Sequence, residues 1–260
     1  MDTLPKHSAS ARATGAALRV PEITAAFWII KGLSTALGES ASDYLVNAMV
    51  PEIAVLLGFA GFCFALWLQF RARRYVAWTY WFAVVMVGVF GTMAADVMHV
   101  GFHVPYTAST ILYACLLAAV FVAWRRSENT LSIHSVDTAR REAFYWATVV
   151  ATFAMGTALG DFTATTLHLG FWTSAVVFAA LISIPALGYF RLGWNPILCF
   201  WSAYVVTRPL GASVADGLAK SKALSGLGIG DAPVTGVLAA LILAMVLYVA
   251  KRPARFAQAQ

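Results

Sequence analysis

One signature occurs four times in this chain of 260 residues, and its internal spacing never changes. Each copy has an aromatic residue followed by Trp, then nine residues, a Gly, four further residues and an Asp. The copies are Phe27-Trp28 with Gly38 and Asp43, Tyr80-Trp81 with Gly91 and Asp96, Tyr145-Trp146 with Gly156 and Asp161, and Phe200-Trp201 with Gly211 and Asp216. Because an internal repeat determines the architecture before any local pattern does, we expect four copies of one structural unit.

The composition indicates a polytopic membrane protein. Hydrophobic residues make up 60% of the chain and charged residues only 12%, more apolar surface than a soluble domain of this length needs. The net charge of +6 arises from basic residues between the apolar segments. The expected surroundings are therefore a lipid bilayer, and a nucleic-acid partner is not expected.

Eight apolar stretches are long enough to cross a bilayer, which takes about 20 residues per helix. Helices are expected throughout, because lipid offers the backbone no hydrogen bonds. Three prolines, Pro51, Pro105 and Pro233, stand where second helices of a repeat should start, a position that tolerates proline. The predicted spans are 22–47, 50–70, 76–99, 105–124, 142–168, 171–190, 195–219 and 232–250.

Each repeat is predicted to be a two-helix hairpin with the signature on its first helix. The predicted repeats are about 22–70, 76–124, 142–190 and 195–250, within a transmembrane domain of residues 21–250. Residues 1–20 have no contiguous apolar core, so we expect a disordered cytoplasmic tail rather than a signal peptide. Residues 251–260 are expected to form a second cytoplasmic tail.

The distribution of Lys and Arg predicts the orientation. The N-terminal tail, the segments after the second, fourth and sixth spans, and the C-terminal end carry most basic residues, whereas the opposite loops hold only Lys220 and Lys222. Both termini are therefore expected in the cytoplasm of a bacterium, across its inner membrane. Two spans per repeat keep all copies parallel. Either a pseudo-fourfold ring or two four-helix halves is possible, and in both the first helices form the inner set.

With these copies identified, the chain resembles a bacterial membrane-protein family built from four tandem two-helix repeats. The repeated tryptophan of that family is matched here by Trp28, Trp81, Trp146 and Trp201. The resemblance covers residues 22 to about 250 and implies an integral inner-membrane protein with eight spans. The activity of the family is not established, so the resemblance implies a fold and no chemistry.

Charged residues lie deep in the first and last repeats. Counting back from the repeated Asp in steps of four places Glu39, Thr35 and Lys31 on one face of the first helix, and Arg208 on the equivalent face of the seventh. A charge at a helix centre costs roughly 2.5–3.5 kcal/mol on insertion scales, so such groups should face inward and pair. We expect a Glu39–Arg208 ion pair, either on a substrate or proton pathway with Lys31 or as a structural lock between the first and last repeats.

Three histidines follow the Asp of the middle repeats. His99 and His103 come three and seven residues after Asp96, and His168 comes seven residues after Asp161. Both offsets return to the Asp face if the helix continues. Imidazole with carboxylate can hold a divalent transition metal or relay protons. The alternative is that each histidine is a polar residue at a helix end.

The repeated residues also have functional and structural interpretations. A ring of Asp43, Asp96, Asp161 and Asp216 at the outer mouth would attract cations, although each Asp could instead cap a helix.

The tryptophans are expected in an aromatic belt or between repeats. The repeated glycines should allow close approach of the helices, and they are Gly38, Gly91, Gly156 and Gly211. The three cysteines, Cys63, Cys115 and Cys199, are expected to be buried and unpaired.

These patterns favour a small secondary transporter or permeation pathway for a cation, with a divalent transition metal as one candidate. An enzyme is less favoured, because the sequence has no phosphate-binding Gly loop, His-Glu-x-x-His helix or nucleophile elbow. A metal-dependent hydrolase or haem protein using the same histidines is the alternative, and a non-catalytic scaffold is a third hypothesis. The oligomeric state is left open.

Overall fold

The computed structural model describes residues 17–251, and this part of the chain is helical without strands. The eight predicted long helices are confirmed. They are α1 (Ala25–Ala48), α2 (Pro51–Ala72), α3 (Ala77–Asp96), α4 (Tyr106–Glu128), α5 (Ala139–Asp161), α6 (Gly170–Arg191), α7 (Pro196–Ala219) and α8 (Asp231–Ala250). Four short helical turns connect them, namely η1 (Val97–Gly101), η2 (Ile133–Ser135), η3 (Phe162–Thr166) and η4 (Lys222–Leu224).

Several helices begin at residues that satisfy or dispense with free backbone N–H groups. The Thr24 hydroxyl accepts from the N–H of Phe27 at the start of α1, and the Asn195 side chain accepts from Ile197 and Leu198 at the start of α7. Pro51 is the first residue of α2, and Pro105 immediately precedes α4. Residues close in the sequence therefore determine where these helices begin.

Seven of the eight helices are long and apolar enough to cross a membrane, so this is a multi-pass membrane protein. The exception, α1, is as long as the others at 24 residues but carries Lys31, Glu39 and Asp43. Its Lys31 is fully buried and its Glu39 is 4% exposed. The side chains of Lys31 and Glu39 thus lie inside the protein and Asp43 is partly buried, while large apolar side chains of α2, α4, α6 and α8 are exposed on the outside.

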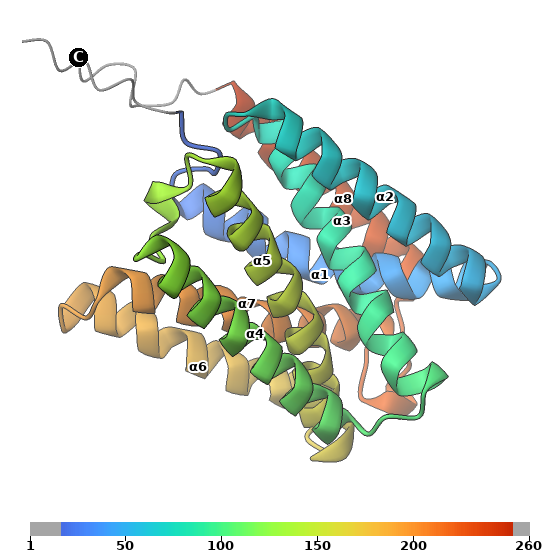
Figure 1. Cartoon of the computed structure of the whole chain (residues 1–260). Helices are drawn as coiled ribbons and strands as arrows, with labels where there is room; N and C mark the ends of the chain where they lie inside the picture. Colours follow the sequence, from blue (N-terminus) through green and yellow to red (C-terminus); the bar gives the residue numbers. More distant parts are fainter. Residues whose placement is uncertain (1–16, 252–260) are drawn as a thin grey trace, which may run out of the picture.

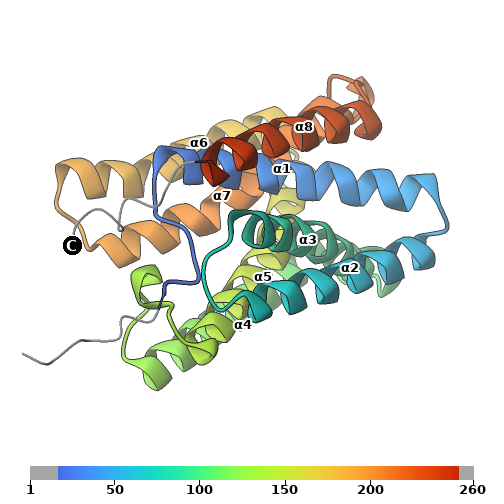
Figure 2. The same ribbon diagram turned by 90° about the horizontal axis from the view of Figure 1, so that it is seen from above.

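The first helices of the four repeats form a closed inner ring. Helix α1 packs on α3, α3 on α5, α5 on α7, and α7 returns to α1. Figure 1 shows this inner set crossing the middle of the molecule, and Figure 2 shows it from above. Of the two arrangements predicted from sequence, the contacts support the pseudo-fourfold ring.

The two helices of each repeat follow one another as predicted, but the outer helix packs chiefly on another repeat. Helix α2 packs mainly on α3, α4 on α5 and α6 on α7, each on the first helix of the following repeat. Helix α8 packs on α1 and has few contacts with α7, so the last repeat closes against the first. Each repeat therefore completes its apolar interface only with its neighbour, as expected for a repeat that cannot bury its surface alone.

The aromatic pairs of the signature follow the same ring. The Trp of each repeat lies against the aromatic residue that precedes the Trp of the previous repeat, with centroid separations of 5.5–6.1 Å for Tyr80–Trp146 and Tyr145–Trp201. The remaining contacts are Phe27–Trp81 and the closing contact Phe200–Trp28, both at 5.7 Å. The tryptophans therefore pack between repeats, one of the two roles expected for them.

Residues at the N-terminal end also contact the core. Residues 1–16 of the predicted tail and residues 252–260 lie outside the described part of the chain. Arg19, however, donates to the buried Glu142 of α5 at 2.7 Å, and Val20 is buried. Gln69, near the end of α2, donates to the other oxygen of Glu142 at 2.9 Å.

The three cysteines are unpaired, as expected. Only Cys199 is buried, however, since Cys63 and Cys115 lie on outer surfaces.

Candidate functional site

The polar core is organised around the guanidinium of Arg208. Its Nη2 lies 2.6 Å from Glu39 Oε2 on α1 and donates to the hydroxyls of Thr92 on α3 and Thr157 on α5, the latter at 2.6 Å. Arg208 is fully buried. The predicted Glu39–Arg208 ion pair is thus confirmed, and the same side chain connects α7 to all three other inner helices.

The repeat explains this arrangement. Glu39, Thr92 and Thr157 occupy the same signature position, one residue after the repeated Gly, and Ala212 occupies it in the fourth repeat. Arg208 precedes Ala212 by one helical turn, so its long side chain supplies the polar group that α7 lacks at that level. The Arg208 guanidinium therefore bonds to three side chains at equivalent positions of the repeat. Thr92 and Thr157, which were not predicted as site residues, belong to the site.

The repeated glycines make room for the ring. A Cβ atom at Gly38 would come within 2.8 Å of the Gly88 backbone on α3, and one at Gly91 within 3.0 Å of the Phe153 Cβ on α5. At Gly156 a Cβ would come within 2.3 Å of Arg208 Cγ, and at Gly211 within 2.0 Å of Thr35 Oγ1. Each repeated Gly thus faces the next inner helix, as small residues do where membrane helices approach closely.

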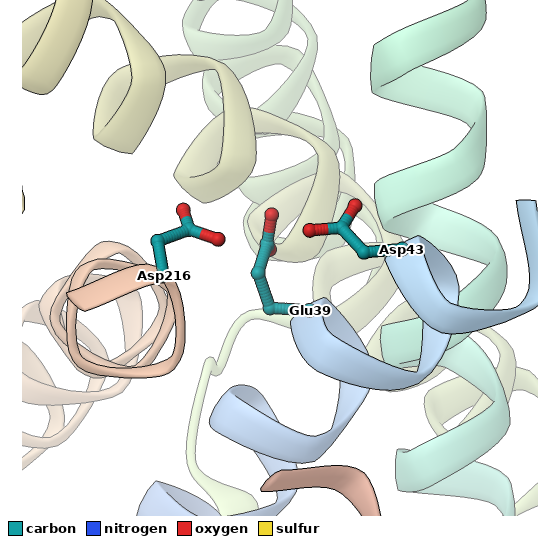
Figure 3. Close-up of side chains that lie close together, drawn as sticks. All are labelled: Glu39, Asp43 and Asp216. Carbon is teal, nitrogen blue, oxygen red and sulfur yellow. The ribbon is translucent and has the colours of Figure 1, made fainter. Parts of the chain in front are cut away.

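A group of carboxylates lies on the side of Arg208 toward the C-terminal ends of α1 and α7. Oxygen atoms of Glu39, Asp43 and Asp216 all lie within 4.8 Å of one another. Figure 3 shows the three carboxyl groups pointing into the same space, two from α1 and one from α7. Glu39 and Asp216 are buried and Asp43 is partly buried. We call these three residues the acidic cluster.

Lys220 borders the acidic cluster and was not predicted as part of the site. Its Nζ pairs with Asp43 and lies 4.0 Å from Asp216 and 3.8 Å from Asp231 at the start of α8. Burial alone would lower the pKa of Lys220, but the negative charges of Asp43, Asp216 and Asp231 outweigh it and raise that pKa above its ordinary value. The spacing of four residues from Asp216 to Lys220 was the available sequence signal.

The other two repeated aspartates face the same charges. Asp96 lies in the field of Asp161, Glu39 and Asp43, and Asp161 in the field of Glu39 and Asp43. Both are partly buried. Each ends its α-helix and is followed at once by a π-helical turn, η1 after Asp96 and η3 after Asp161. Single π turns of this kind are often found at functional sites.

The predicted metal ligand set of Asp96, His99, His103, Asp161 and His168 is not gathered in the described residues. Within residues 17–251, the acidic cluster is the one group of three or more ligand side chains with atoms close enough to share an ion. His99 Nδ1 lies 2.9 Å from the Val104 carbonyl oxygen, and its ring stacks on Tyr106. His103 and His168 are exposed and have left-handed backbones with φ of 55°.

The predicted ligand set does not come together because the helical geometry changes after Asp96 and Asp161. The expected return to the Asp face required an α-helix that continues for seven residues. Instead the π turns alter the angle per residue, and the helices end at Gly101 and Thr166, before His103 and His168. These two histidines are therefore helix-end residues, as the alternative interpretation had it.

Lys31 is separated from the acidic cluster. Its ammonium nitrogen has no hydrogen-bond partner and lies 4.3 Å from the ring centroids of both Phe153 and Tyr204. Arg208 lies over the Phe153 ring too, at 5.2 Å. The structure therefore places Lys31 in the inner ring as predicted, but the expected pairing of its charge is wrong, because its neighbours are aromatic rings rather than carboxylates.

A family model of a repeat of unknown function, DUF347, matches residues 26–75, 79–130, 144–193 and 199–253. The chain belongs to this family. The four matched segments are the four repeats of the ring, so the resemblance inferred from the repeated tryptophans is confirmed. Comparison with curated proteins and with solved structures gave no match. The DUF347 family thus contributes a repeat and a copy number, and the chemistry rests on the residues above.

Proposed function

We propose that this DUF347 protein is a small secondary transporter or permeation pathway for a cation, with the acidic cluster as its cation site. The observation that carries the proposal is the convergence of Glu39, Asp43 and Asp216 within 4.8 Å of one another inside a ring of membrane helices. Ionisable groups within the spans of a membrane protein are functional hypotheses by default, and carboxylates in a pathway select cations.

The charge balance around the cluster supports this assignment. Asp96, Asp161 and Asp231 add carboxyl groups to the three of the cluster, whereas Arg208 pairs with Glu39, and Lys220 with Asp43, Asp216 and Asp231. Carboxyl groups therefore outnumber the cations of the protein at this end of the ring. A bound cation would find several carboxyl oxygens there as ligands.

The ligand chemistry favours an oxygen-preferring cation. Ca²⁺ binds oxygen at 2.3–2.6 Å, so a single ion can bridge oxygens up to about 5 Å apart. Carboxylate sites suit Mg²⁺, Ca²⁺ and Mn²⁺, whereas sites for other transition metals usually contain imidazole or thiolate. The positions of His103 and His168 give no support to transition-metal ligation by histidine, nor to a hydrolase or haem protein that would use these residues.

We further propose the bacterial inner membrane as the location, with both termini in the cytoplasm. Arg19 contacts Glu142 in the first turn of α5. The helices α2, α4 and α6 carry basic residues in their last turns, at the end of the molecule where α5 begins. Cytoplasmic loops carry an excess of Lys and Arg. The acidic cluster, at the C-terminal ends of α1 and α7, would then open toward the outside.

The test is cation binding and flux by the purified full-length protein. Isothermal titration with Mn²⁺, Mg²⁺ and Ca²⁺ should show binding by the wild type that Asp43→Asn/Asp216→Asn removes. A saturating ion at 100 times its Kd should also stabilise the wild type by about 2.7 kcal/mol. The matched control is His103→Ala/His168→Ala, which alters two exposed histidines and should bind as the wild type does.

Proteoliposomes then distinguish transport from a structural role. The wild type should admit the bound cation, and the double asparagine variant should not, although it remains folded. A wild type that neither binds nor admits these ions would overturn the proposal. Unimpaired flux in the double variant would show that the carboxylates only hold the ring together.

A further inference from the structure

A groove of about 410 Å³ lies on the outer face of α5, between α2 and α4. All the residues that line it are apolar, and they include Leu66 and Phe70 of α2, Leu116 and Val120 of α4, and Trp146 of α5. Because these three helices are apolar enough to cross a membrane, the groove faces lipid hydrocarbon. Its volume is within the range of small-molecule sites, roughly 300–1,000 Å³. The groove can therefore take a hydrocarbon chain.

Two alanines leave this space open. Ala143 comes three residues before the signature Trp of the third repeat, and Ala147 directly follows that Trp. The second repeat has Trp78 and Phe82 at the same two positions. These two aromatic residues line a smaller groove, of about 190 Å³, between α3 and α8. The third repeat thus has methyl groups where the second repeat has large rings.

The indole of Trp146 is a buried donor without an acceptor. Trp146 is 2% exposed, and its Nε1 has no hydrogen-bond partner within residues 17–251. The indoles at two equivalent positions have protein neighbours, since Trp201 donates to the Leu131 carbonyl at 2.8 Å and Trp81 interacts with the Tyr75 hydroxyl. A buried Trp N–H usually finds an acceptor. A ligand in the groove with an oxygen beside its hydrocarbon chain would supply one to Trp146.

Positive charges lie at one end of the groove. Phe70 is in the last turn of α2, and the exposed Arg73 and Arg74 follow it directly after the helix. The last turn of α4 carries Arg125 and Arg126, which are also exposed. None of these four arginines forms an ion pair in the part of the chain that the structure describes. Basic pockets between transmembrane helices bind the headgroups of anionic lipids.

We propose that this groove binds one anionic phospholipid. An acyl chain lies between α2 and α4, an ester oxygen accepts the hydrogen bond of Trp146, and the phosphate lies among the arginines that follow α2 and end α4. The lipid site is separate from the acidic cluster and does not depend on cation transport.

A second copy of the chain is a less suitable occupant. The backbone carbonyls of a transmembrane helix are bonded within the helix, so an apolar helix face brings no acceptor for the Trp146 indole. Such a face also brings no negative charge for the arginines. A phospholipid supplies the hydrocarbon, the acceptor and the charge in one molecule.

The experiment counts the lipids that the full-length protein retains. The protein is reconstituted in vesicles of equal phosphatidylglycerol and phosphatidylethanolamine with identical acyl chains, extracted in mild detergent and measured by native mass spectrometry. The wild type should retain one phospholipid per chain, with phosphatidylglycerol preferred at least fivefold.

Ala143→Trp/Ala147→Phe fills the groove with the side chains that the second repeat has at these positions. Since α3 carries the same pair, the α5 variant should fold, and it should retain at least tenfold less lipid than the wild type. The control is Val176→Trp, which adds similar bulk to α6 at a side chain that is 69% exposed. It should retain lipid as the wild type does.

Two further variants test the polar contacts and remain informative if the filled groove does not fold. Trp146→Phe removes the indole donor and should lower lipid retention at least threefold. Arg73→Gln/Arg74→Gln should remove the preference for phosphatidylglycerol while a phospholipid is still retained. The matched control, Arg191→Gln/Lys251→Gln, makes the same charge change at the ends of α6 and α8 and should keep the preference.

Three results would overturn the lipid site. The first is a wild type that retains no lipid, whether as a monomer or as a dimer. The second is equal retention of the two phospholipids by the wild type. The third is unchanged retention in Ala143→Trp/Ala147→Phe, or in Trp146→Phe where the double variant does not fold. Cation binding by the same samples tests the proposed function separately, so either proposal can fail alone.

Discussion

The Cγ atom of Arg208 lies where a side chain at Gly156 would have to be. A Cβ atom built on Gly156 would come within 2.3 Å of that Cγ and within 2.7 Å of the Arg208 Cβ. The stem of the arginine thus lies against the bare backbone of α5, and this approach lets the guanidinium reach Thr157 one residue further along. The absence of a side chain at Gly156 is therefore what allows the Arg208 side chain to take its place in the ring.

Gly156→Ala should destabilise the protein by about 1–3 kcal/mol, the usual cost of overpacking a well-packed core. The atoms that would clash belong to the base of the arginine side chain, which cannot move away as a flexible tip can. Thermal unfolding in detergent measures the effect. Gly32→Ala, where nothing lies within 4 Å of the added atom, is the control and should be neutral or slightly stabilising. Equal melting temperatures for both variants would contradict the tight contact.

Breaking the Glu39–Arg208 pair from one side should cost more than removing it from both. Glu39→Gln or Arg208→Met leaves a charge buried without its partner, at a cost of about 3–5 kcal/mol. The double variant Glu39→Gln/Arg208→Met leaves no such charge and should be more stable than the Arg208→Met variant. A double-mutant cycle on chemical unfolding measures the coupling. Additive losses would show that the pair contributes nothing as a pair.

Thr157→Val should be more damaging than its size suggests. The variant removes a hydroxyl that accepts from the Arg208 guanidinium, and hydrogen bonds to charged groups contribute about 1.5–3 kcal/mol. Thr148→Val is a matched control on the same helix, because the buried Thr148 hydroxyl bonds only to the Phe144 carbonyl of its own helix. Unfolding free energies should rank the wild type and Thr148→Val together above Thr157→Val. The reverse ranking would falsify the shared role of the threonines.

Lys220→Met should destabilise the connection between α1, α7 and α8, with a defined pH dependence. The folded protein raises the pKa of Lys220 because of Asp43, Asp216 and Asp231. A raised pKa contributes stability that is fully present below the unfolded pKa of about 10.4 and is lost as pH rises through the folded value. The difference in melting temperature between wild type and variant should therefore stay constant from about pH 7 to pH 10.

The exposed Lys222 offers the control, since Lys222→Met changes the same net charge two residues away. It should leave the melting temperature unchanged across this range. A wild-type advantage over Lys220→Met that already declines between pH 8 and pH 9 would contradict the raised pKa.

The repeat determined much of the fold without any tertiary information. Its constant spacing placed four equivalent Trp, Gly and Asp residues on four helices, and the helix starts at Pro51 and Asn195 are local chemistry. The Glu39–Arg208 pair was also predictable, because both residues lie on the helix face of the repeated Asp, four residues before Asp43 and eight residues before Asp216, and so at similar depths. Depth and helix face follow from the rise and turn of one helix, and these are properties of sequence alone.

Only the tertiary structure decided which surfaces meet. That α8 closes on α1, and that each outer helix packs on the following repeat, depends on the summed packing of distant segments. The π turns after Asp96 and Asp161 moved His103 and His168 out of the expected ligand set, and no spacing rule signals such a change. Lys220 joined the acidic cluster because Asp43 and Asp231 come to it from other helices. The sequence by itself determined the spans and the depth of their charges, and long-range packing decided which charges became neighbours.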